Sequence, residues 1–303
     1  LALPYPPKVG SAYLADKGRD FLLAEQYLLS LSNLPRREYM KNAKLCGVYL
    51  ERTRYFLKLL GSPEKKIPHY VHITGTSGKG SVATFMASIL CAAGKRTALL
   101  TSPHASKITE RWQVNGKMMT DKEFIDIANK IKPLLNEYAR KSPYDMVSFH
   151  EITDIIGFYF FAQKKADWAV LEVGCGGRYC SSNVIPHKDA AIITNIGWDH
   201  VELLGPSLKK IAYEKAGIIT CRCPVFTMEK RKKLRAVFEN EAMKYRAVLH
   251  YIQPAFTTHG VTRDPQGARP TTAATSSLAR CGVARSLVTP LEILQSDITG
   301  TAF

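Results

Sequence analysis

Short apolar runs alternate along the chain with longer stretches in which apolar residues recur every three or four positions. The apolar runs, which we interpret as strands, are Tyr70–Ile73, Thr97–Leu100, Trp168–Val173, Ala190–Asn195, Val225–Thr227 and Ala247–Tyr251. Helical spacing occurs between them, at Ser81–Ala93, Thr120–Ala139, Ser148–Phe161, Leu208–Ala216 and Glu229–Tyr245. Near-continuous apolar strands that alternate with helices are typical of a parallel sheet covered on both faces. The pattern therefore predicts an α/β fold with a doubly wound, mostly parallel sheet.

The two ends of the chain depart from this alternation. Residues 1–70 read as helical, because Arg19–Leu31 and Val48–Leu60 both carry apolar residues at helical spacing. From Tyr251 to Phe303 there is no lysine, and Thr, Ala, Ser, Gly, Pro and Arg dominate. We therefore expect a helical N-terminal segment over 1–70, an α/β domain over 71–250 and a poorly ordered tail over 251–303. A frame change in the coding DNA is one hypothesis for the tail, and the natural continuation in another reading frame would support it.

Local signals refine the predicted elements. Thr120-Asp-Lys-Glu123 and Ser148-Phe-His-Glu151 are capping-box patterns, so each predicts the start of a helix. Asn115-Gly116 suits a type I′ turn and predicts a hairpin over Trp112–Met118.

The run that ends at Ile73 leads into a glycine-rich loop followed by a helical pattern. The loop residues are Gly75, Thr76, Ser77, Gly78, Lys79, Gly80, Ser81 and Val82. A strand, a glycine-rich loop and a helix in this order form the setting of a phosphate-binding loop, in which backbone N–H groups and the positive helix end hold an anion. Lys79 offers a full charge to the outer phosphates, and Ser81 offers a hydroxyl to Mg²⁺. An ordinary glycine-rich turn is the alternative, because Gly80 separates Lys79 from Ser81 where the commonest loop has no insertion.

Polar groups follow four of the predicted strands. They are Gly75–Ser81, Ser102–His104, Gly174–Arg178 and Asn195–His200. In an open α/β sheet, ligands bind beyond the carboxyl ends of the strands, so we expect all four groups to face one crevice.

Several acidic and basic residues keep two interpretations. Glu172 and Glu151 could be metal-linked carboxylates, although for Glu151 a helix cap is the simpler interpretation. Asp199-His200 could hold a metal or a catalytic proton, or be structural. Glu214-Lys215-Ala-Gly217 has the form of a charged helix end before a glycine cap.

Composition narrows the class of protein. The chain has 303 residues, a length that fits one large or two smaller domains, and 46% of them are hydrophobic. The net charge of +16 permits nucleic acid as a partner, but the basic residues are scattered over helices such as Glu229–Tyr245, so we expect none. No run reaches the ~20 apolar residues of a membrane span, so we expect no membrane partner.

The first residues and the cysteines indicate where the chain begins and in which compartment it is found. Leu1 is not a start methionine and Leu1–Gly10 lacks a signal-peptide pattern, so we expect the chain to begin inside a longer one. Seven cysteines at irregular positions predict a reducing, cytoplasmic location. Cys221-x-Cys223 and Cys175…Cys180 lack metal-site spacing, and we interpret them as buried or idle thiols.

A set of ordered motifs resembles the folylpolyglutamate synthase/dihydrofolate synthase family of the Mur ligase superfamily. The motifs are Leu50-Glu-Arg-Thr-Arg54, Leu60-Gly-Ser-Pro63, Gly75-Thr-Ser-Gly-Lys-Gly-Ser-Val82, Thr101-Ser-Pro-His104, Thr109-Glu-Arg111, Leu171-Glu-Val-Gly-Cys-Gly-Gly-Arg178, Ile196-Gly-Trp-Asp-His200 and Glu214-Lys-Ala-Gly-Ile218. The resemblance covers roughly residues 20–250.

The resemblance implies an ATP-dependent amide ligase, in which ATP phosphorylates a carboxylate and the amine of L-glutamate attacks the acyl phosphate. It implies catalytic roles for Lys79, His200 and Lys215, with Lys215 carbamylated as in family members. It implies Mg²⁺ ligands at Ser81, Glu151, His200 and Lys215. It also implies a site for folate or dihydropteroate at Ser102, Pro103, His104, Arg178 and Asn183, and we expect a monomer.

Two departures from the family pattern matter. Cys180 stands where family members commonly carry an Asp, and a thiol is a poor substitute for a carboxylate acceptor. The family also has a second, smaller α/β domain that closes over ATP, and residues 251–303 are too short and wrongly composed for it. The alternatives are therefore another Mur-type amino-acid ligase, or a nucleotide-binding fragment without ligase activity.

Overall fold

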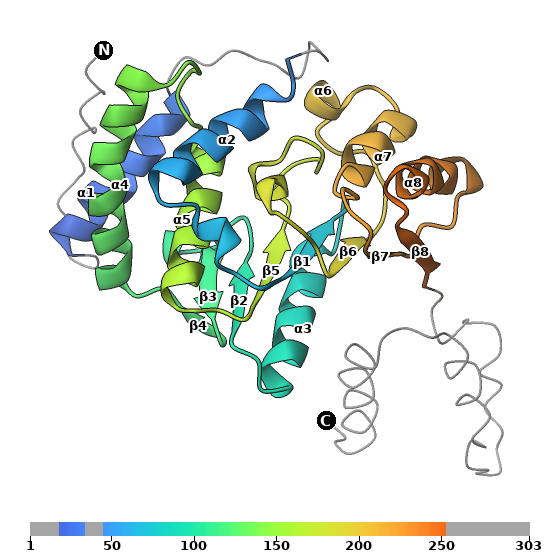
Figure 1. Ribbon diagram of the computed structural model, residues 1–303, viewed down its shortest axis with the longest axis horizontal. Helices are drawn as coiled ribbons and strands as arrows, with labels where there is room; N and C mark the ends of the chain where they lie inside the picture. Colours follow the sequence, from blue (N-terminus) through green and yellow to red (C-terminus); the bar gives the residue numbers. More distant parts are fainter. Residues whose placement is uncertain (1–17, 34–44, 253–303) are drawn as a thin grey trace. The chain divides into compact units, whose positions relative to one another are not determined.

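A computed structural model describes residues 18–33 and 45–252 (Figure 1). Its centre is an eight-stranded sheet with the strand order β4-β3-β2-β5-β1-β6-β7-β8. The strands are β1 (His69–Thr74), β2 (Thr97–Leu100), β3 (Trp112–Val114), β4 (Lys117–Met118), β5 (Trp168–Glu172), β6 (Ala190–Ile193), β7 (Pro224–Thr227) and β8 (Val248–Tyr251). Neighbouring strands pair in parallel except at β2–β3 and at β3–β4, and the β3–β4 pair is the predicted hairpin over Trp112–Met118. The predicted fold class, a doubly wound and mostly parallel α/β sheet, is confirmed.

Helices cover both faces of the sheet. They are α1 (Arg19–Ser30), α2 (Val48–Leu59), α3 (Lys79–Ala92), α4 (Asp121–Lys141), α5 (Phe149–Gln163), α6 (Val201–Leu204), α7 (Leu208–Ala216) and α8 (Lys232–Tyr245). Short 3-10 turns occur at Leu31–Asn33, Pro63–Lys65, Ile108–Arg111 and Ser181–Val184. In Figure 1, α3 lies apart from the group formed by α1, α2, α4 and α5.

Alternating strand residues divide between the two faces, as the period of a strand requires. Leu99 of β2 and Val170 of β5 pack with α3, whereas Leu100 and Leu171, the next residues, pack in the core of α1, α2, α4 and α5. At the other end of the sheet, Ile193 packs in a third core with residues of α7 and α8. Since the central strands β2, β5 and β6 are almost wholly buried between the two helical layers, their sequences are mostly apolar.

Two helix starts differ from the sequence-based expectation by two or more residues. Helix α3 begins at Lys79 rather than Ser81, because Gly78 takes the left-handed conformation (φ +77°) that closes the loop. Helix α8 begins at Lys232 rather than Glu229, because the buried Glu229 carboxylate accepts hydrogen bonds from the backbone and side chain of Arg231 and forms a turn there.

The described part of the N-terminal segment belongs to the main core. Phe21 of α1 packs on Phe124 of α4 with ring centroids 4.9 Å apart, and the ring centroids of Phe56 of α2 and Tyr138 are 5.7 Å apart. The domain limits at 70 and 250 stay predictions, and the predicted tail from 253 onward lies outside the described residues. Within residues 18–33 and 45–252, no helix has the length and apolarity needed to cross a membrane.

Candidate functional site: a phosphate-binding loop beside a cavity

The loop between β1 and α3 is built to receive an anion. Gly75 and Gly78 have φ of +148° and +77°, which L side chains rarely adopt, so the loop turns tightly into α3. No side chain of the described residues caps the first turn of α3, which leaves the positive end of the helix directed into the loop. Lys79 reaches back over the loop, with its ammonium 3.4 Å from the carbonyl oxygen of Thr76. The geometry fits the phosphates of a nucleotide.

The loop that follows β6 fixes the phosphate loop in place. The Thr194 hydroxyl donates to the Ser77 carbonyl oxygen (2.7 Å), and the Asn195 side-chain oxygen accepts from the Ser77 N–H (2.9 Å). Gly75 packs so closely on this loop that a Cβ there would lie 1.8 Å from the Thr194 hydroxyl oxygen. The Gly197 N–H donates to the Thr76 hydroxyl (2.9 Å). The predicted meeting of these two strand ends is confirmed.

Lys215, at the end of α7, ties a third element to the loop. Its ammonium is buried and donates to the carbonyl oxygen of Gly75 (2.8 Å) and to Asp199 Oδ2 (2.7 Å). Burial lowers the pKa of Lys215, although the ion pair with Asp199 opposes that shift. A lowered pKa favours the neutral amine, which is the form that reacts with carbon dioxide. Carbamylation of Lys215 stays a prediction.

Glu172, at the end of β5, is the carboxylate beside the phosphate loop. It is buried, and its Oε2 accepts from the Ser102 N–H at 2.9 Å, which joins the strand ends of β2 and β5. A Cβ on Gly80 would lie 3.3 Å from the same oxygen. Burial raises the pKa of Glu172, while Ser102, Lys79 and Arg111 oppose the shift. A buried carboxylate next to the first turn of α3 is a chemically suitable cation ligand.

Glu151 has a different environment. Its carboxylate accepts from Arg52 Nε (2.8 Å) and from the Ser148 N–H, and its own N–H donates to the Ser148 hydroxyl (3.1 Å). The second capping box is therefore confirmed, and a buried ion pair is added to it. Each Glu151 oxygen already has a protein donor, so Glu172 fits a cation better than Glu151 does. The metal role of Glu151 stays a prediction.

The remaining residues predicted to bind metal lie around the loop after β6. His200 is half exposed, with a left-handed backbone (φ +41°), and its Nε2 lies 3.4 Å from Asp199 Oδ1. Ser81 is exposed in the first turn of α3. The described residues contain no group of three or more His, Cys, Asp and Glu side chains that could hold a metal by themselves. Mg²⁺ commonly takes one or two carboxylates and completes its shell with substrate phosphates and water, so Glu172 and Ser81 fit it.

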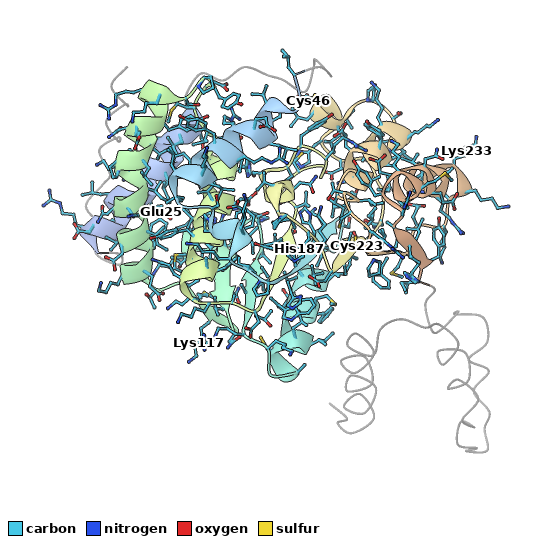
Figure 2. All side chains as sticks on the ribbon, in the orientation of Figure 1. Glu25, Cys46, Lys117, His187, Cys223 and Lys233 are labelled. Atoms are coloured by element: carbon cyan, nitrogen blue, oxygen red, sulfur yellow. The ribbon has the colours of Figure 1, made fainter. Side chains whose placement is uncertain are left out.

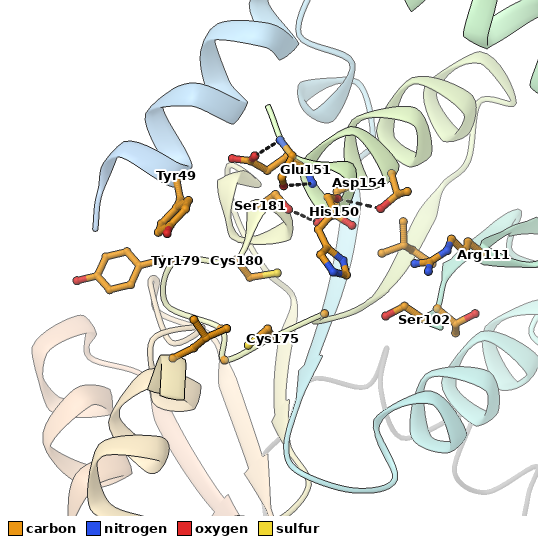
Figure 3. Close-up of a pocket in the computed structure, with 18 of the residues that line it drawn as sticks. Tyr49, Ser102, Arg111, His150, Glu151, Asp154, Cys175, Tyr179, Cys180 and Ser181 are labelled. Atoms are coloured by element: carbon orange, nitrogen blue, oxygen red, sulfur yellow. Dashed lines mark hydrogen bonds between the residues drawn. The ribbon is translucent and has the colours of Figure 1, made fainter. Parts of the chain in front are cut away.

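A cavity of about 240 Å³ lies at the carboxyl ends of β2 and β5 (Figure 3). The loops after β2 and β5 contribute Ser102 and the segment 174–177, and helices α2 and α5 contribute Tyr49 and Asp154. Its walls combine aromatic and aliphatic side chains with a few polar groups, an arrangement that suits a planar organic ligand.

Asp154 is the most perturbed carboxylate of the cavity. Burial raises its pKa to about 7, while a hydrogen bond from the Ser181 hydroxyl and the charge of Arg111 oppose the shift. Figure 3 shows Asp154 directed toward Ser181, with Arg111 on the adjoining wall. A carboxyl group that titrates near neutral pH can either accept or donate a hydrogen bond to a ligand. Sequence reasoning missed Asp154; its one signal was a polar residue three positions after Glu151 in an apolar helix.

The residues predicted to bind substrate divide into two groups. Ser102 lines the cavity, and His104 next to it accepts a hydrogen bond from Arg111 Nε at 2.9 Å. Arg178 donates to Glu241 and to the Tyr213 carbonyl oxygen, and Asn183 donates to the Gly217 carbonyl oxygen. Arg178 and Asn183 thus hold α7 and α8 in place through their side chains. A direct role for Arg178, Asn183 or the exposed Pro103 in substrate binding stays a prediction.

Cys180, which stands where the resembling family has an Asp, is a partly buried thiol of the cavity wall. Its sulfur lies 3.1 Å from the Ser182 hydroxyl oxygen, and burial raises its pKa. The only ionisable carboxyl groups that line the described cavity are therefore Glu151, Asp154 and Glu214.

The chain is similar to known proteins in both sequence and fold. The family model of the Mur ligase middle domain matches residues 73–244. A folylpolyglutamate synthase of Arabidopsis thaliana is 33% identical over 235 residues, which are 76% of this chain and 40% of that protein. The dihydrofolate synthase/folylpolyglutamate synthase of Bacillus subtilis is 36% identical over 207 residues, 68% of this chain and 47% of that protein. A solved FPGS–AMPPCP–folate complex superposes with a TM-score of 0.67 at 28% identity, over 76% of this chain and 53% of that one. The chain thus spans about half the length of these relatives.

Proposed function

The chain belongs to the Mur ligase family, within its folylpolyglutamate synthase/dihydrofolate synthase group, and from this premise we propose that it is the nucleotide-binding part of an ATP-dependent amide ligase. The ligase joins L-glutamate to a carboxylate of folate or dihydropteroate. The observation that carries the proposal is the phosphate loop, whose uncapped helix end and Lys79 lie beside the buried carboxylate of Glu172. The relative solved with AMPPCP and folate supports ATP and a folate as ligands.

The proposed reaction has two steps. A carboxylate oxygen of the folate attacks the γ-phosphorus of ATP, the bond to the β–γ bridging oxygen breaks, and ADP leaves. The amino nitrogen of glutamate then attacks the acyl carbon, loses a proton, and expels phosphate as the amide forms. Both steps place negative charge on oxygen, so catalysis consists mainly of positioning and positive charge.

This chain's residues supply those two requirements. The N–H groups at the start of α3 and the Lys79 ammonium would hold the β- and γ-phosphates. Lys215, by its bond to the Gly75 carbonyl oxygen, would keep the loop in the conformation that receives them. Mg²⁺, when bound by Ser81 and Glu172, would reduce the charge of the phosphate oxygens. The predicted second metal at His200 and Lys215 requires carbamylation of Lys215, because an ammonium repels a cation.

The cavity at the carboxyl ends of β2 and β5 is the proposed folate or dihydropteroate site. It lies between Ser102 and the strand end of β5, so a ligand there would point one end toward the phosphate loop. Its aromatic walls, among them Tyr49 and Trp112, suit a flat ring system. Asp154 would bind a polar edge of that ring. We further propose a monomer in a reducing, cytoplasmic compartment; the six cysteines among the described residues are free thiols.

Two measurements on the purified chain test the proposal. Binding of an ATP analogue should fall at least tenfold, about 1.4 kcal/mol, in Lys79→Ala and stay unchanged in Lys95→Ala, an exposed lysine after the far end of α3. Equal affinity in both variants would overturn the nucleotide site.

The second measurement is release of ADP with ATP, Mg²⁺ and L-glutamate in the presence of dihydropteroate or tetrahydrofolate. Glutamate-dependent release with either pterin compound supports the ligase. Release only with a UDP-muramoyl substrate would instead assign a cell-wall ligase. Nucleotide binding without release under all conditions would leave this chain as a binding fragment.

A further inference from the structure

Glu229 and Arg231 form an ion pair on the loop between β7 and α8. Glu229 is buried, and both of its oxygens accept from the Arg231 guanidinium, Oε1 from Nε at 2.7 Å and Oε2 from Nη2 at 2.6 Å. The Arg231 N–H also donates to Oε1, at 2.9 Å. A carboxylate and a guanidinium joined by two parallel bonds fix each other's direction as well as their distance. The pair is therefore a rigid feature of this loop.

The ion pair holds the main chain of Ile196, which lies on the loop after the neighbouring strand β6. Glu229 Oε2 accepts from the Ile196 N–H at 3.3 Å, and Arg231 Nη2 donates to the Ile196 carbonyl oxygen. The Ile196 side chain is buried in the core of α7 and α8. Both main-chain polar groups and the side chain of this one residue are thus fixed by the part of the sheet around β7.

The two sequence neighbours of Ile196 both bind the phosphate loop. The Asn195 carbonyl oxygen accepts from the Thr76 N–H at 3.0 Å, and the Asn195 side-chain oxygen accepts from the Ser77 N–H at 2.9 Å. On the other side of Ile196, the Gly197 N–H donates to the Thr76 hydroxyl at 2.9 Å, and this hydroxyl lies 3.2 Å from the Gly197 carbonyl oxygen. The segment Asn195–Gly197 therefore joins the ion pair to the phosphate loop.

We propose that Glu229 and Arg231 are positioning residues of the nucleotide site, which hold Ile196 so that the phosphate loop keeps the conformation that receives the phosphates. Neither residue lies in the phosphate loop or among the residues that line the cavity, so both act through the segment Asn195–Gly197. The proposal rests on the proposed function for its ligand, ATP, and on hydrogen bonds of the main chain for its geometry.

Arg231 separates this role from one of stability alone. Its side chain is 48% exposed, and an ion pair with such a partner contributes little to the free energy of unfolding. Without the guanidinium, the Glu229 carboxylate keeps its two main-chain donors, the N–H groups of residues 196 and 231. The Ile196 carbonyl oxygen, in contrast, loses the donor that Arg231 provides. We therefore expect Arg231→Met to loosen the segment Asn195–Gly197 while the rest of the fold is preserved.

Hydrogen–deuterium exchange of the full chain without nucleotide tests the positioning directly. In Arg231→Met, the amides of Thr76, Ser77 and Gly197 should exchange roughly fivefold faster, which is the effect of losing one hydrogen bond that supports them. The amides within β1 should be unchanged. The affinity for an ATP analogue should fall by a similar factor, roughly fivefold. Arg231→Lys should recover part of both effects, because an ammonium can donate to the Ile196 carbonyl oxygen but lacks the fork that also binds Glu229.

Lys233→Met is the matched control, because Lys233 is an exposed cation at the start of the same helix, on its outer side in Figure 2. It should change neither exchange nor affinity. Unchanged exchange in Arg231→Met, or faster exchange with the affinity of the wild-type protein, would overturn the proposal. The exchange is measured without nucleotide, whereas the nucleotide site fails if Lys79→Ala and Lys95→Ala bind alike, so the two proposals fail separately.

Discussion

The Glu172 carboxylate lies against the first turn of α3, so that a methyl group on residue 80 would lie 3.3 Å from Glu172 Oε2. That separation is tighter than most contacts of a Cβ, and Glu172 cannot retreat freely because Ser102 N–H holds the same oxygen at 2.9 Å. The extra glycine of the phosphate loop therefore has a physical reason: it lets the helix end approach a buried carboxylate.

Gly80→Ala should consequently weaken binding of Mg·ATP while preserving the fold. Alanine favours a helix by about 1 kcal/mol over glycine, which offsets the cost of displacing Glu172, so the free energy of unfolding should change by less than about 1 kcal/mol. Isothermal titration with an ATP analogue and Mg²⁺, together with urea unfolding, measures both effects. Gly47→Ala is the control, because a Cβ at Gly47 meets nothing within 4 Å. Unchanged affinity in Gly80→Ala would show that the approach of Glu172 to the loop does not matter for binding.

Substitution of the two glutamates should separate a structural from a metal-linked carboxylate. Glu151→Gln weakens a buried ion pair with Arg52, so we expect it to lose roughly 1–3 kcal/mol of unfolding free energy. Glu172→Gln should be neutral or stabilising without ligand, since burial raises the pKa of Glu172 and its charge costs folding free energy.

The same two variants should differ in the opposite way in how their nucleotide affinity depends on Mg²⁺. Glu172→Gln should abolish the gain in nucleotide affinity that Mg²⁺ gives, and Glu151→Gln should retain it. Titrations with and without Mg²⁺ provide the measurement. If Glu151→Gln loses the Mg²⁺ effect and Glu172→Gln keeps it, the metal site belongs to Glu151 after all.

The helices and strands could be predicted from the sequence because the patterns that indicate them are local. The strands Thr97–Leu100 and Trp168–Glu172 are apolar runs, and the Asn115-Gly116 turn carries its own signature, so periodicity and turn chemistry predict them. The common crevice also followed, since parallel strands end at one edge, and Gly75 does pack on Thr194 from another strand end.

The hydrogen-bond and ion-pair partners of the site residues could not be predicted in this way. Arg52 and Glu151 are 99 positions apart in the sequence, and Lys215 and Gly75 are 140 positions apart. A local sequence pattern therefore cannot predict either hydrogen bond. The capping box at Ser148 predicted where Glu151 sits, but not that its second oxygen meets Arg52. Asp154 differs again, because its perturbed pKa arises from burial by the whole cavity wall.

Lys215→Met should destabilise the fold and the nucleotide site together. It leaves the mostly buried Asp199 carboxylate and the Gly75 carbonyl oxygen without their donor, and loss of one partner of a buried pair typically costs about 3–5 kcal/mol. The double variant Lys215→Met/Asp199→Asn should recover part of that loss, because it removes the unpaired charge. Urea unfolding measures the cycle, with the exposed Lys209→Met as control. A double variant less stable than Lys215→Met would contradict the pairing.

Asp154 should make stability fall as pH rises from about 4 to about 7. Its pKa is about 7 in the folded protein, against 3.8 for an ordinary Asp, so in this window the folded state keeps a proton that the unfolded state has lost. The sign is therefore destabilising with increasing pH, at most about 1.4 kcal/mol per pH unit, and the effect levels off above pH 7. Asp154→Asn should flatten this slope, since the amide oxygen can still accept from Ser181 but cannot ionise. Urea midpoints of both proteins between pH 4.5 and 8 give the difference curve, with Asp126→Asn at an exposed ion pair as control. A difference curve that is flat, or that rises with pH, would mean that Asp154 stays ionised throughout and enters the cavity as a fixed negative charge.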